Sequence, residues 1–267
     1  MLSLYKVLTP LLLIMFLVNS SELSAKNYAV LISVGDYKNH PDIAYANSDA
    51  ALMGLTLLSH RLGPISEEDI FYLFNENATS DNIAIVLSHL SRILVASDQL
   101  VIYYSGHGYF GGLHTYDYND NDTFSYKDLR SYLRNTKCRD KIIILDTCYS
   151  GSLFLHSEED VKQLEQYFSN NRKKKYSNKN TIVIMSSRLD QSSYETPHLG
   201  HGLFTYFLCK GLNGSSDYNR DNKISIEELY YYTRDNVYLY MKGKTSKNQC
   251  PTLMGNYQNN YIISKKK

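Results

Sequence analysis

Two apolar runs of the sequence each lead into a residue that can do chemistry. The segment KIIILDTCYSG (141–151) ends its aliphatic stretch close to Cys148, and QLVIYYSGHG (99–108) leads in the same way to His107. A thiol becomes a strong nucleophile when it loses its proton, and a neighbouring imidazole can take that proton and return it to a leaving amine. A Cys and a His that meet would form such a dyad. The alternative is a buried cysteine and an unrelated loop histidine.

The elements that precede these residues indicate that they meet. After position 26, short apolar runs typical of buried parallel strands alternate with helical segments. Parallel strands end at one edge of a sheet, where open α/β sheets bind ligands, so His107 and Cys148 are predicted to share a cleft. The predicted class is α/β, a mostly parallel open sheet with helices on both faces. Strands are expected at 27–35, 69–74, 99–105, 141–146 and 181–187, and helices at about 45–60, from Thr79 to Leu94, and at 126–135, 201–212 and 225–241.

The composition narrows the class of partner. The chain has 267 residues, a net charge of +1, 43% hydrophobic and 21% charged residues, which is typical of a globular protein and gives no field that would attract nucleic acid. Its four cysteines include no CxxC pair, so no zinc motif is predicted. The oligomeric state and any disulfide among Cys138, Cys209 and Cys250 stay open.

The N-terminus has the pattern of a signal peptide over residues 1–25. A short segment with Lys6 precedes an apolar stretch from Val7 to Val18, and small residues end at Ala25. The stretch is shorter than the ~20 residues that a membrane span needs, although an uncleaved anchor is the alternative. We therefore expect an exported protein, periplasmic or secreted, that has no contact with the membrane after cleavage.

Several motifs of this sequence resemble those of a known family. YYSGHG (103–108) and DTCYSG (146–151) are similar to the histidine and cysteine motifs of caspase and metacaspase cysteine peptidases. The resemblance extends over 27–256, mostly to the bacterial type, through SSRLDQSSYE (186–195), GHGLFTYFLCKGLNG (200–214) and QCPTLMGN (249–256). It implies a caspase-haemoglobinase fold and an endopeptidase that cleaves proteins or peptides through a thioester acyl-enzyme. No cofactor is required for that chemistry.

The resemblance also assigns roles to residues. Cys148 is the nucleophile, His107 is the acid and base, and the backbone N–H groups of Gly108 and Cys148 form the oxyanion hole. Asp146 is interpreted as a structural residue that closes the loop. The family's division implies a domain over 26–256 with a large part at 26–155, an exposed linker at 156–180 and a small part at 181–256. A C-terminal tail is expected at 257–267.

Substrate preference depends on which charged residue reaches the cleft. In metacaspases the segment similar to DQSSYE ends in an acidic residue that binds Arg or Lys, and Glu195 holds that position here. Arg188 is the alternative, and pointing inward it would select an acidic residue. A basic preference would make Arg-Lys-Lys-Lys at 172–175 a site of self-cleavage, since family members are often cut in this linker.

One acidic segment fits a calcium loop. In DYNRDNKISIEEL (217–229) the spacing of ligands in an EF-hand loop falls on Asp217, Asn219, Asp221, Lys223 through its carbonyl, and Glu228. A polar turn before a capped helix is the alternative. The related segment at 117–129 fits less well, and Asp120 and Asp122 are further candidates because some metacaspases are activated by calcium. Ca²⁺ is thus an optional ligand.

Two other functions remain open at this point. One is an asparagine-directed peptidase or transamidase similar to legumains, in which a His and a Cys also follow successive strands. The other is a caspase-like module that binds calcium and has lost catalysis.

Overall fold

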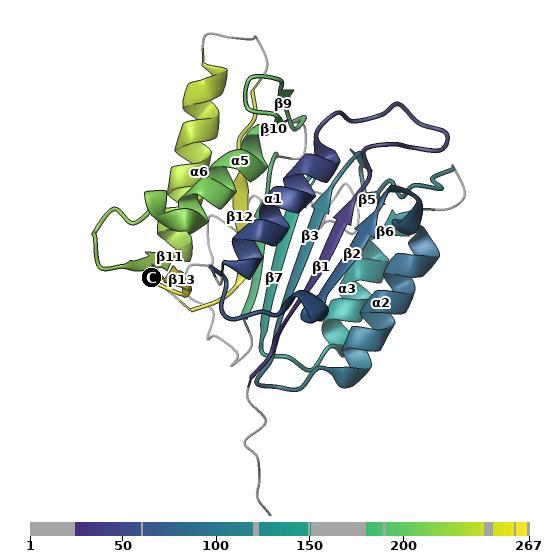
Figure 1. Ribbon diagram of the computed structural model, residues 1–267, viewed down its shortest axis with the longest axis horizontal. Helices are drawn as coiled ribbons and strands as arrows, with labels where there is room; N and C mark the ends of the chain where they lie inside the picture. The colour runs from purple at the N-terminus through teal and green to yellow at the C-terminus, as the bar shows by residue number, and fades with distance from the viewer. Residues whose placement is uncertain are drawn as a thin grey trace, which may run out of the picture.

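The central element is a six-stranded sheet with the strand order β12-β8-β7-β3-β1-β2 (Figure 1). This computed structural model describes residues 25–59, 61–119, 123–148, 150, 180–188, 191–242, 248–258 and 260–265. Five neighbouring strands are parallel, and β12 runs antiparallel to β8 at one edge. The strands are β1 (Asn27–Ser33), β2 (Ile70–Phe74), β3 (Gln99–Ser105), β7 (Asp140–Asp146), β8 (Asn180–Met185) and β12 (Thr252–Asn256).

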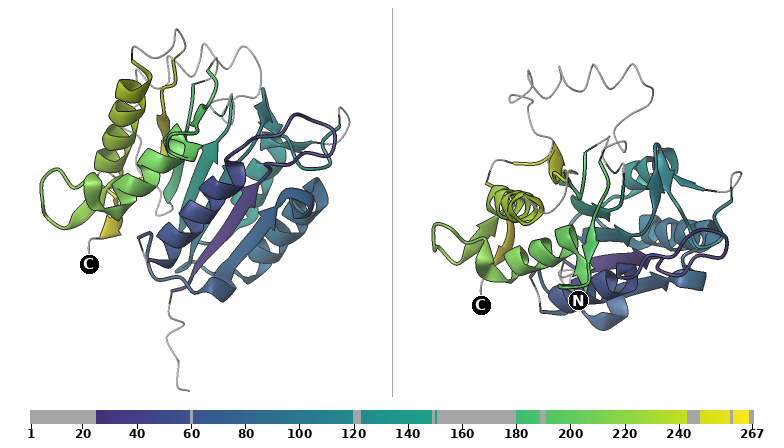
Figure 2. Two further views of the ribbon diagram at one scale, coloured as in Figure 1. Left: turned by 45° about the horizontal axis from the view of Figure 1, so that its top comes forward. Right: turned by 90° about the horizontal axis from the view of Figure 1, so that it is seen from above.

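Helices cover both faces of this sheet. Figures 1 and 2 show α1 and α5, with α6 beside them, on one face, and α2 and α3 on the other. The helices are α1 (Ala46–Leu58), α2 (Ser80–Ile93), α3 (Tyr126–Asn135), α5 (Leu203–Lys210) and α6 (Ile226–Met241), with single turns at Glu67–Asp69, Asn75–Asn77 and Gly211–Ser215. Short strands complete the described elements: β4 (Gly108–Tyr109), β5 (Gly112–Leu113), β6 (Phe124–Ser125), β9 (Glu195–Thr196), β10 (His201–Gly202), β11 (Lys223–Ser225) and β13 (Ile262–Lys265).

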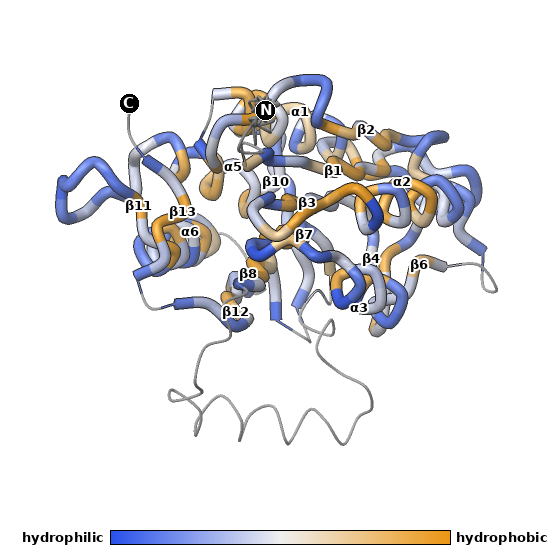
Figure 3. The backbone as a smooth tube through the Cα atoms, turned by 90° about the horizontal axis from the view of Figure 1, so that it is seen from below, coloured by the Kyte–Doolittle hydropathy of each residue, from blue (hydrophilic) through white to orange (hydrophobic). Residues whose placement is uncertain are grey.

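The two faces of the sheet build two separate cores. Along β3, Val101 and Tyr103 pack with α1 and α5, whereas Ile102 and Tyr104 pack with α2 and α3. This alternation follows from the two-residue period of a strand, and it needs strands that are apolar on both sides. In Figure 3 these strands form a hydrophobic layer between the helices.

The predicted elements agree closely with the structure. The expected fold class is confirmed, and Thr79 caps α2 as expected by accepting the Asn82 N–H at 3.2 Å. The segment 257–267, expected as a tail, instead contributes β13, which pairs antiparallel with β11. The proposed signal segment before Ala25 and the run 172–175 lie outside the described residues. Within the part of the chain that is described, no helix has the length and apolar character to cross a membrane.

Candidate active site

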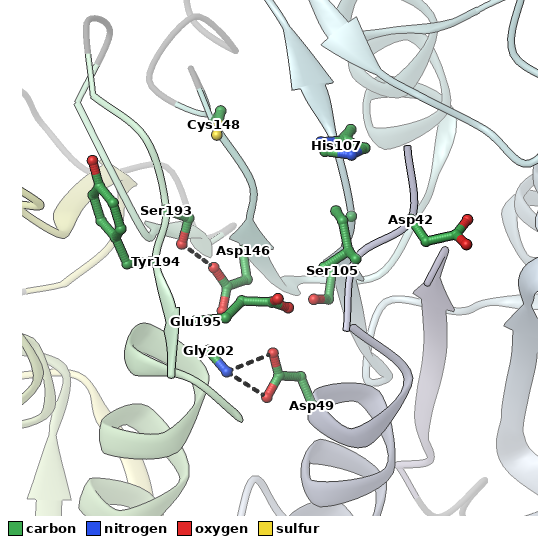
Figure 4. Close-up of a pocket in the computed structure, with 12 residues that line it drawn as sticks. Asp42, Asp49, Ser105, His107, Asp146, Cys148, Ser193, Tyr194, Glu195 and Gly202 are labelled. Carbon is green, nitrogen blue, oxygen red and sulfur yellow. Dashed lines mark hydrogen bonds between the residues drawn. The ribbon is translucent and has the colours of Figure 1, made fainter. Parts of the chain in front are cut away.

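The register of the sheet brings the histidine and the cysteine to one place. Ser105, the last residue of β3, pairs with Asp146, the last residue of β7, and the Gly106 N–H donates to the Asp146 carbonyl at 3.3 Å. His107 and Cys148 each follow two residues beyond this pair. Both line one pocket of about 380 Å³, and Figure 4 shows them on opposite sides of it. The expected meeting of the two strand ends is therefore observed.

Backbone and tyrosine groups fix the histidine. The His107 Nε2 atom lies 2.9 Å from the Pro41 carbonyl oxygen, which can only accept, so Nε2 carries a proton and Nδ1 is the basic nitrogen of the neutral ring. The His107 N–H donates to the Tyr37 hydroxyl at 2.6 Å. The Tyr104 hydroxyl donates to the His107 carbonyl at 2.6 Å. Burial lowers the pKa of His107; the hydrogen bond to the Pro41 carbonyl opposes this and His40 adds to it, so the neutral ring that can accept a proton is favoured.

Gly108 lies where only a glycine fits. A Cβ atom there would overlap the Thr147 hydroxyl and would lie 2.8 Å from the Cys148 carbonyl oxygen. The backbone that follows the histidine is therefore packed directly against the backbone of the cysteine. The two residues named for the oxyanion hole, Gly108 and Cys148, are thus neighbours in space.

The floor of the pocket is acidic. Asp49 from α1, Asp146 from the end of β7 and Glu195 from β9 line it, as Figure 4 shows. Asp42 lies at the rim with its carboxylate turned away from the floor. Among the described residues that line the pocket there is no Lys or Arg.

Hydrogen bonds hold each of the three floor carboxylates in place. Both Asp49 oxygens accept the Gly202 N–H at 3.1 Å. Asp146 accepts from the hydroxyls of Ser193 and Thr205, the latter at 2.7 Å, and Glu195 accepts the Tyr45 N–H at 3.1 Å.

The carboxyl groups on the floor are close to one another. A Cβ atom on Gly202 would lie 2.8 Å from Asp49 Oδ2 and 2.9 Å from Asp146 Oδ2, so only a glycine can separate them. Burial raises the pKa of Asp49 to about 7, and the charge of Asp146 adds to this. Burial also raises the pKa of Asp146 and of Glu195. A cation in this pocket would gain the attraction of several weakly hydrated carboxylates.

Of the two residues predicted to set substrate preference, Glu195 lines the pocket and Arg188 does not. The structure brings Glu195 together with His107 and Cys148. It does not bring Arg188 there: this residue follows the buried Ser187, is exposed, and its N–H donates to Gln191 Oε1 at 3.4 Å. Asp146, expected as structural, does hold the loop through Ser193 and Thr205, but it also lines the pocket.

The predicted calcium ligands are used in the turn and the helix cap. Glu228 accepts the Ser225 N–H at 2.9 Å, and the Ser225 hydroxyl accepts the Glu228 N–H at 3.2 Å, which forms a capping box at the start of α6. Asn219 accepts the Asp221 N–H, and Asp221 accepts the Lys223 N–H. In the described residues no three His, Cys, Asp or Glu side chains, Asp217 included, gather as a metal site. Asp120 and Asp122 lie outside the described residues. Calcium binding stays a prediction.

Two members of the site were missed from the sequence. Asp49 lies on the buried face of α1, among Ala46, Ala50 and Met53, and a lone acid on an apolar helix face is the pattern that points to it. The Pro41 carbonyl is a backbone group in a loop, and no residue type marks it.

Comparisons with known proteins agree with this fold. A family model described as "Caspase domain" matches residues 26–261. The crystal structure of caspase-1 from Spodoptera frugiperda superimposes with a TM-score of 0.62 at 12% identity, covering 91% of this chain and 93% of that one. A protein of Geobacter sulfurreducens superimposes with a TM-score of 0.57 at 13% identity, covering 90% of this chain and 100% of the other. No curated protein matches the chain.

Proposed function

Because the chain belongs to the caspase domain family, we propose that it is a cysteine endopeptidase that cleaves after Arg or Lys. The observation that carries the proposal is the register of β3 and β7, which places His107 and Cys148 two residues beyond a paired Ser105 and Asp146 and in one pocket.

The chemistry follows from the groups around the two residues. His107 Nδ1 takes the proton of the Cys148 thiol, and the sulfur attacks the carbonyl carbon of the scissile peptide. The backbone N–H groups of Gly108 and Cys148 are the proposed donors to the resulting oxyanion. The intermediate then breaks its C–N bond, the amine leaves with the proton from His107, and a thioester remains. Water, deprotonated by His107, hydrolyses this thioester and restores the thiol. The Pro41 carbonyl stabilises the imidazolium that forms in between, because it accepts from Nε2.

The acidic floor supports the basic preference. A substrate guanidinium or ammonium group on this floor would pair with Asp49, Asp146 and Glu195, whereas an Asp side chain would be repelled. An asparagine side chain would leave these buried acids without a cation. The floor therefore favours Arg or Lys over both other choices.

Export and self-cleavage belong to the same proposal. The pattern of residues 1–25 supports cleavage after Ala25 and passage to the periplasm or medium, and the run 172–175 offers the preferred residue type. N-terminal sequencing of protein recovered from the producing cells should find Lys26 as the first residue, with a second start within 173–176. Cys148→Ala protein should show only the first.

The test is hydrolysis of three peptides that differ only in Arg, Asn or Asp at the cleaved position. The mature protein should hydrolyse the Arg peptide fastest. Cys148→Ala and His107→Ala should retain less than about 1% of this rate, since each removes a group that acts in the chemical step. Cys250→Ala, which removes another half-buried free thiol, should keep the wild-type rate. Faster turnover of the Asn peptide would favour the legumain-like function, and no turnover with folded protein would favour the silent module.

A further inference from the structure

A histidine lies directly behind the acidic floor of the pocket. His201 Nδ1 is 3.0 Å from Asp49 Oδ1, and the next residue, Gly202, donates its N–H to the same carboxylate. The Asp49 side chain is 2% exposed, whereas the His201 side chain is 22% exposed. His201 therefore connects a buried carboxylate of the pocket with solvent.

We propose that His201 is a positioning residue that holds Asp49 as an anion and so sets how strongly the pocket prefers a cationic substrate residue. This inference rests on the proposed function, since it concerns the same pocket. His201 is not among the residues that line the pocket, so it acts through Asp49 and not on the substrate.

The groups around the pair explain why Asp49 needs such a partner. Asp146 faces Asp49 across Gly202, and Glu195 pairs with Gly202 on the neighbouring strand β9. The charge of Asp146 opposes the ionisation of Asp49. Tyr103 of β3 and Cys209 of α5 also interact with Asp49, and burial raises the pKa of both, so both stay uncharged. Tyr206 stacks near the His201 ring at 6.3 Å, with the Lys210 ammonium 5.9 Å from the Tyr206 ring. Among these described neighbours, His201 is the side chain that donates directly to Asp49.

The pKa of Asp49 therefore lies near neutral pH, where a small change in its surroundings alters its charge. Burial and Asp146 raise its pKa to about 7, while the hydrogen bond from His201 opposes the rise. A donor to a carboxylate stabilises its charged form, whether the imidazole is neutral with Nδ1–H or fully protonated. Without His201 the carboxyl group would keep its proton to higher pH, and the attraction for a substrate cation would begin only there.

The test compares two peptide substrates over pH 5.5 to 9. One carries Arg at the cleaved position, and the other carries citrulline, which has the same shape and no charge. In wild-type protein the ratio of kcat/KM for Arg over citrulline should fall as the pH drops below about 7, where Asp49 gains its proton. His201→Ala should move the midpoint of this fall about one pH unit upward, since a charge-assisted hydrogen bond is lost. His201→Asn, whose Nδ2 can take the place of Nδ1, should restore most of the wild-type midpoint.

The outcomes separate this inference from the proposed function. A wild-type protein without preference for Arg would overturn the basic pocket and the inference together. A wild-type protein that prefers Arg, with an unchanged midpoint in His201→Ala, would overturn the inference alone. A change confined to kcat for both substrates would mean a structural role and would count against it as well.

A measurement on wild-type protein covers the case in which the variants do not fold. The ring nitrogens of His201 can be observed by ¹⁵N NMR at pH 8, in the absence and presence of saturating agmatine, which carries the guanidinium of an arginine side chain. Nδ1 should carry a proton, because it donates to the Asp49 carboxylate, and its N–H signal should shift when agmatine shares that carboxylate. An Nδ1 without a proton, or an Nδ1–H signal that is the same with and without agmatine, would overturn the proposal.

Discussion

At the scale of single residues, His107, the proposed catalytic histidine, is held by groups that have no charge. Its Nε2 faces a carbonyl, and two tyrosine hydroxyls hold its backbone from both sides. Tyr37 and Tyr104 are buried, so their hydroxyls bring fixed polar groups into the core beneath the His107 loop. The position of the imidazole thus depends on interior tyrosines as well as on the strand that precedes it.

Tyr37→Phe should therefore lower both stability and activity. The change leaves the N–H of His107 without its acceptor, which should cost about 1–3 kcal/mol in the free energy of unfolding, and kcat should fall because the imidazole is less well fixed. Tyr126→Phe is the control for stability: its hydroxyl is buried and has no hydrogen-bond partner among the described residues. That variant should unfold within about 0.5 kcal/mol of wild type or be more stable. Equal losses in urea unfolding of both variants would contradict this account.

The floor carboxylates predict how ligand binding depends on pH. Asp49 has a pKa of about 7 in the folded protein against an ordinary value of 3.8, so it binds its proton more tightly when folded. Its contribution to stability is full below 3.8 and is lost as the pH rises through 7. Agmatine binds the ionised form and should offset this loss.

Agmatine should thus bind at least about tenfold more tightly at pH 8 than at pH 5, measured by calorimetry with Cys148→Ala protein. Asp49→Asn should remove most of this difference. Asp42→Asn, at the rim, should keep it. Affinity that does not change with pH in the parent protein would argue against a cation site on this floor.

At the scale of elements, the sequence predicts the strands and helices well because each has strong local patterning. The predicted ends of β3 and of α3 agree with the structure. Strand β3 is an unbroken apolar run, and the Ser125 cap marks the start of α3. The proximity of His107 and Cys148 follows from their positions just after two neighbouring parallel strands, β3 and β7. Asp49 and Pro41 were missed because they enter the site from α1 and its preceding loop, whose approach to the strand ends is a tertiary contact.

The capping box of α6 gives a prediction that separates the structural role of Glu228 from its predicted role as a calcium ligand. Glu228→Ala should reduce the free energy of unfolding by about 0.5–2 kcal/mol in the presence of a chelator, because the start of α6 loses its reciprocal cap. Asn219→Ala should change it by less, since its partner N–H is exposed. If 217–228 also binds calcium, both variants should weaken the calorimetric isotherm. No heat with wild-type protein would rule out calcium at this segment.

At the scale of the whole molecule, residues beyond the expected domain boundary at 256 pack against the domain. Strand β13 pairs with β11, and Ile263 is 5% exposed within the core that α1, α5 and α6 share. The sequence did not predict this strand because IISK (262–265), between an Asn-containing and a Lys-rich segment, is short and has too few apolar residues to stand out.

A protein that ends at Asn256 should therefore be less stable than one that ends at Lys265. Burial of Ile263 alone contributes about 1.5–3 kcal/mol, and the pairing with β11 adds to it. Thermal unfolding of the two chains checks this, and the shorter chain should melt at the lower temperature. Equal midpoints would mean that 257–265 is a tail after all.

The central claim is that Cys148 is a nucleophile served by a pocket for a cation. The most direct measurement is the rate of covalent labelling by peptidyl acyloxymethyl ketones that carry Arg, citrulline or Asp next to the reactive group, followed by intact mass and peptide mapping. We predict one label per chain, on Cys148, formed fastest with the Arg probe, slowed in Asp49→Asn and absent in Cys148→Ala. A label on Cys250, equal rates for the Arg and citrulline probes, or fastest labelling by the Asp probe would contradict the account.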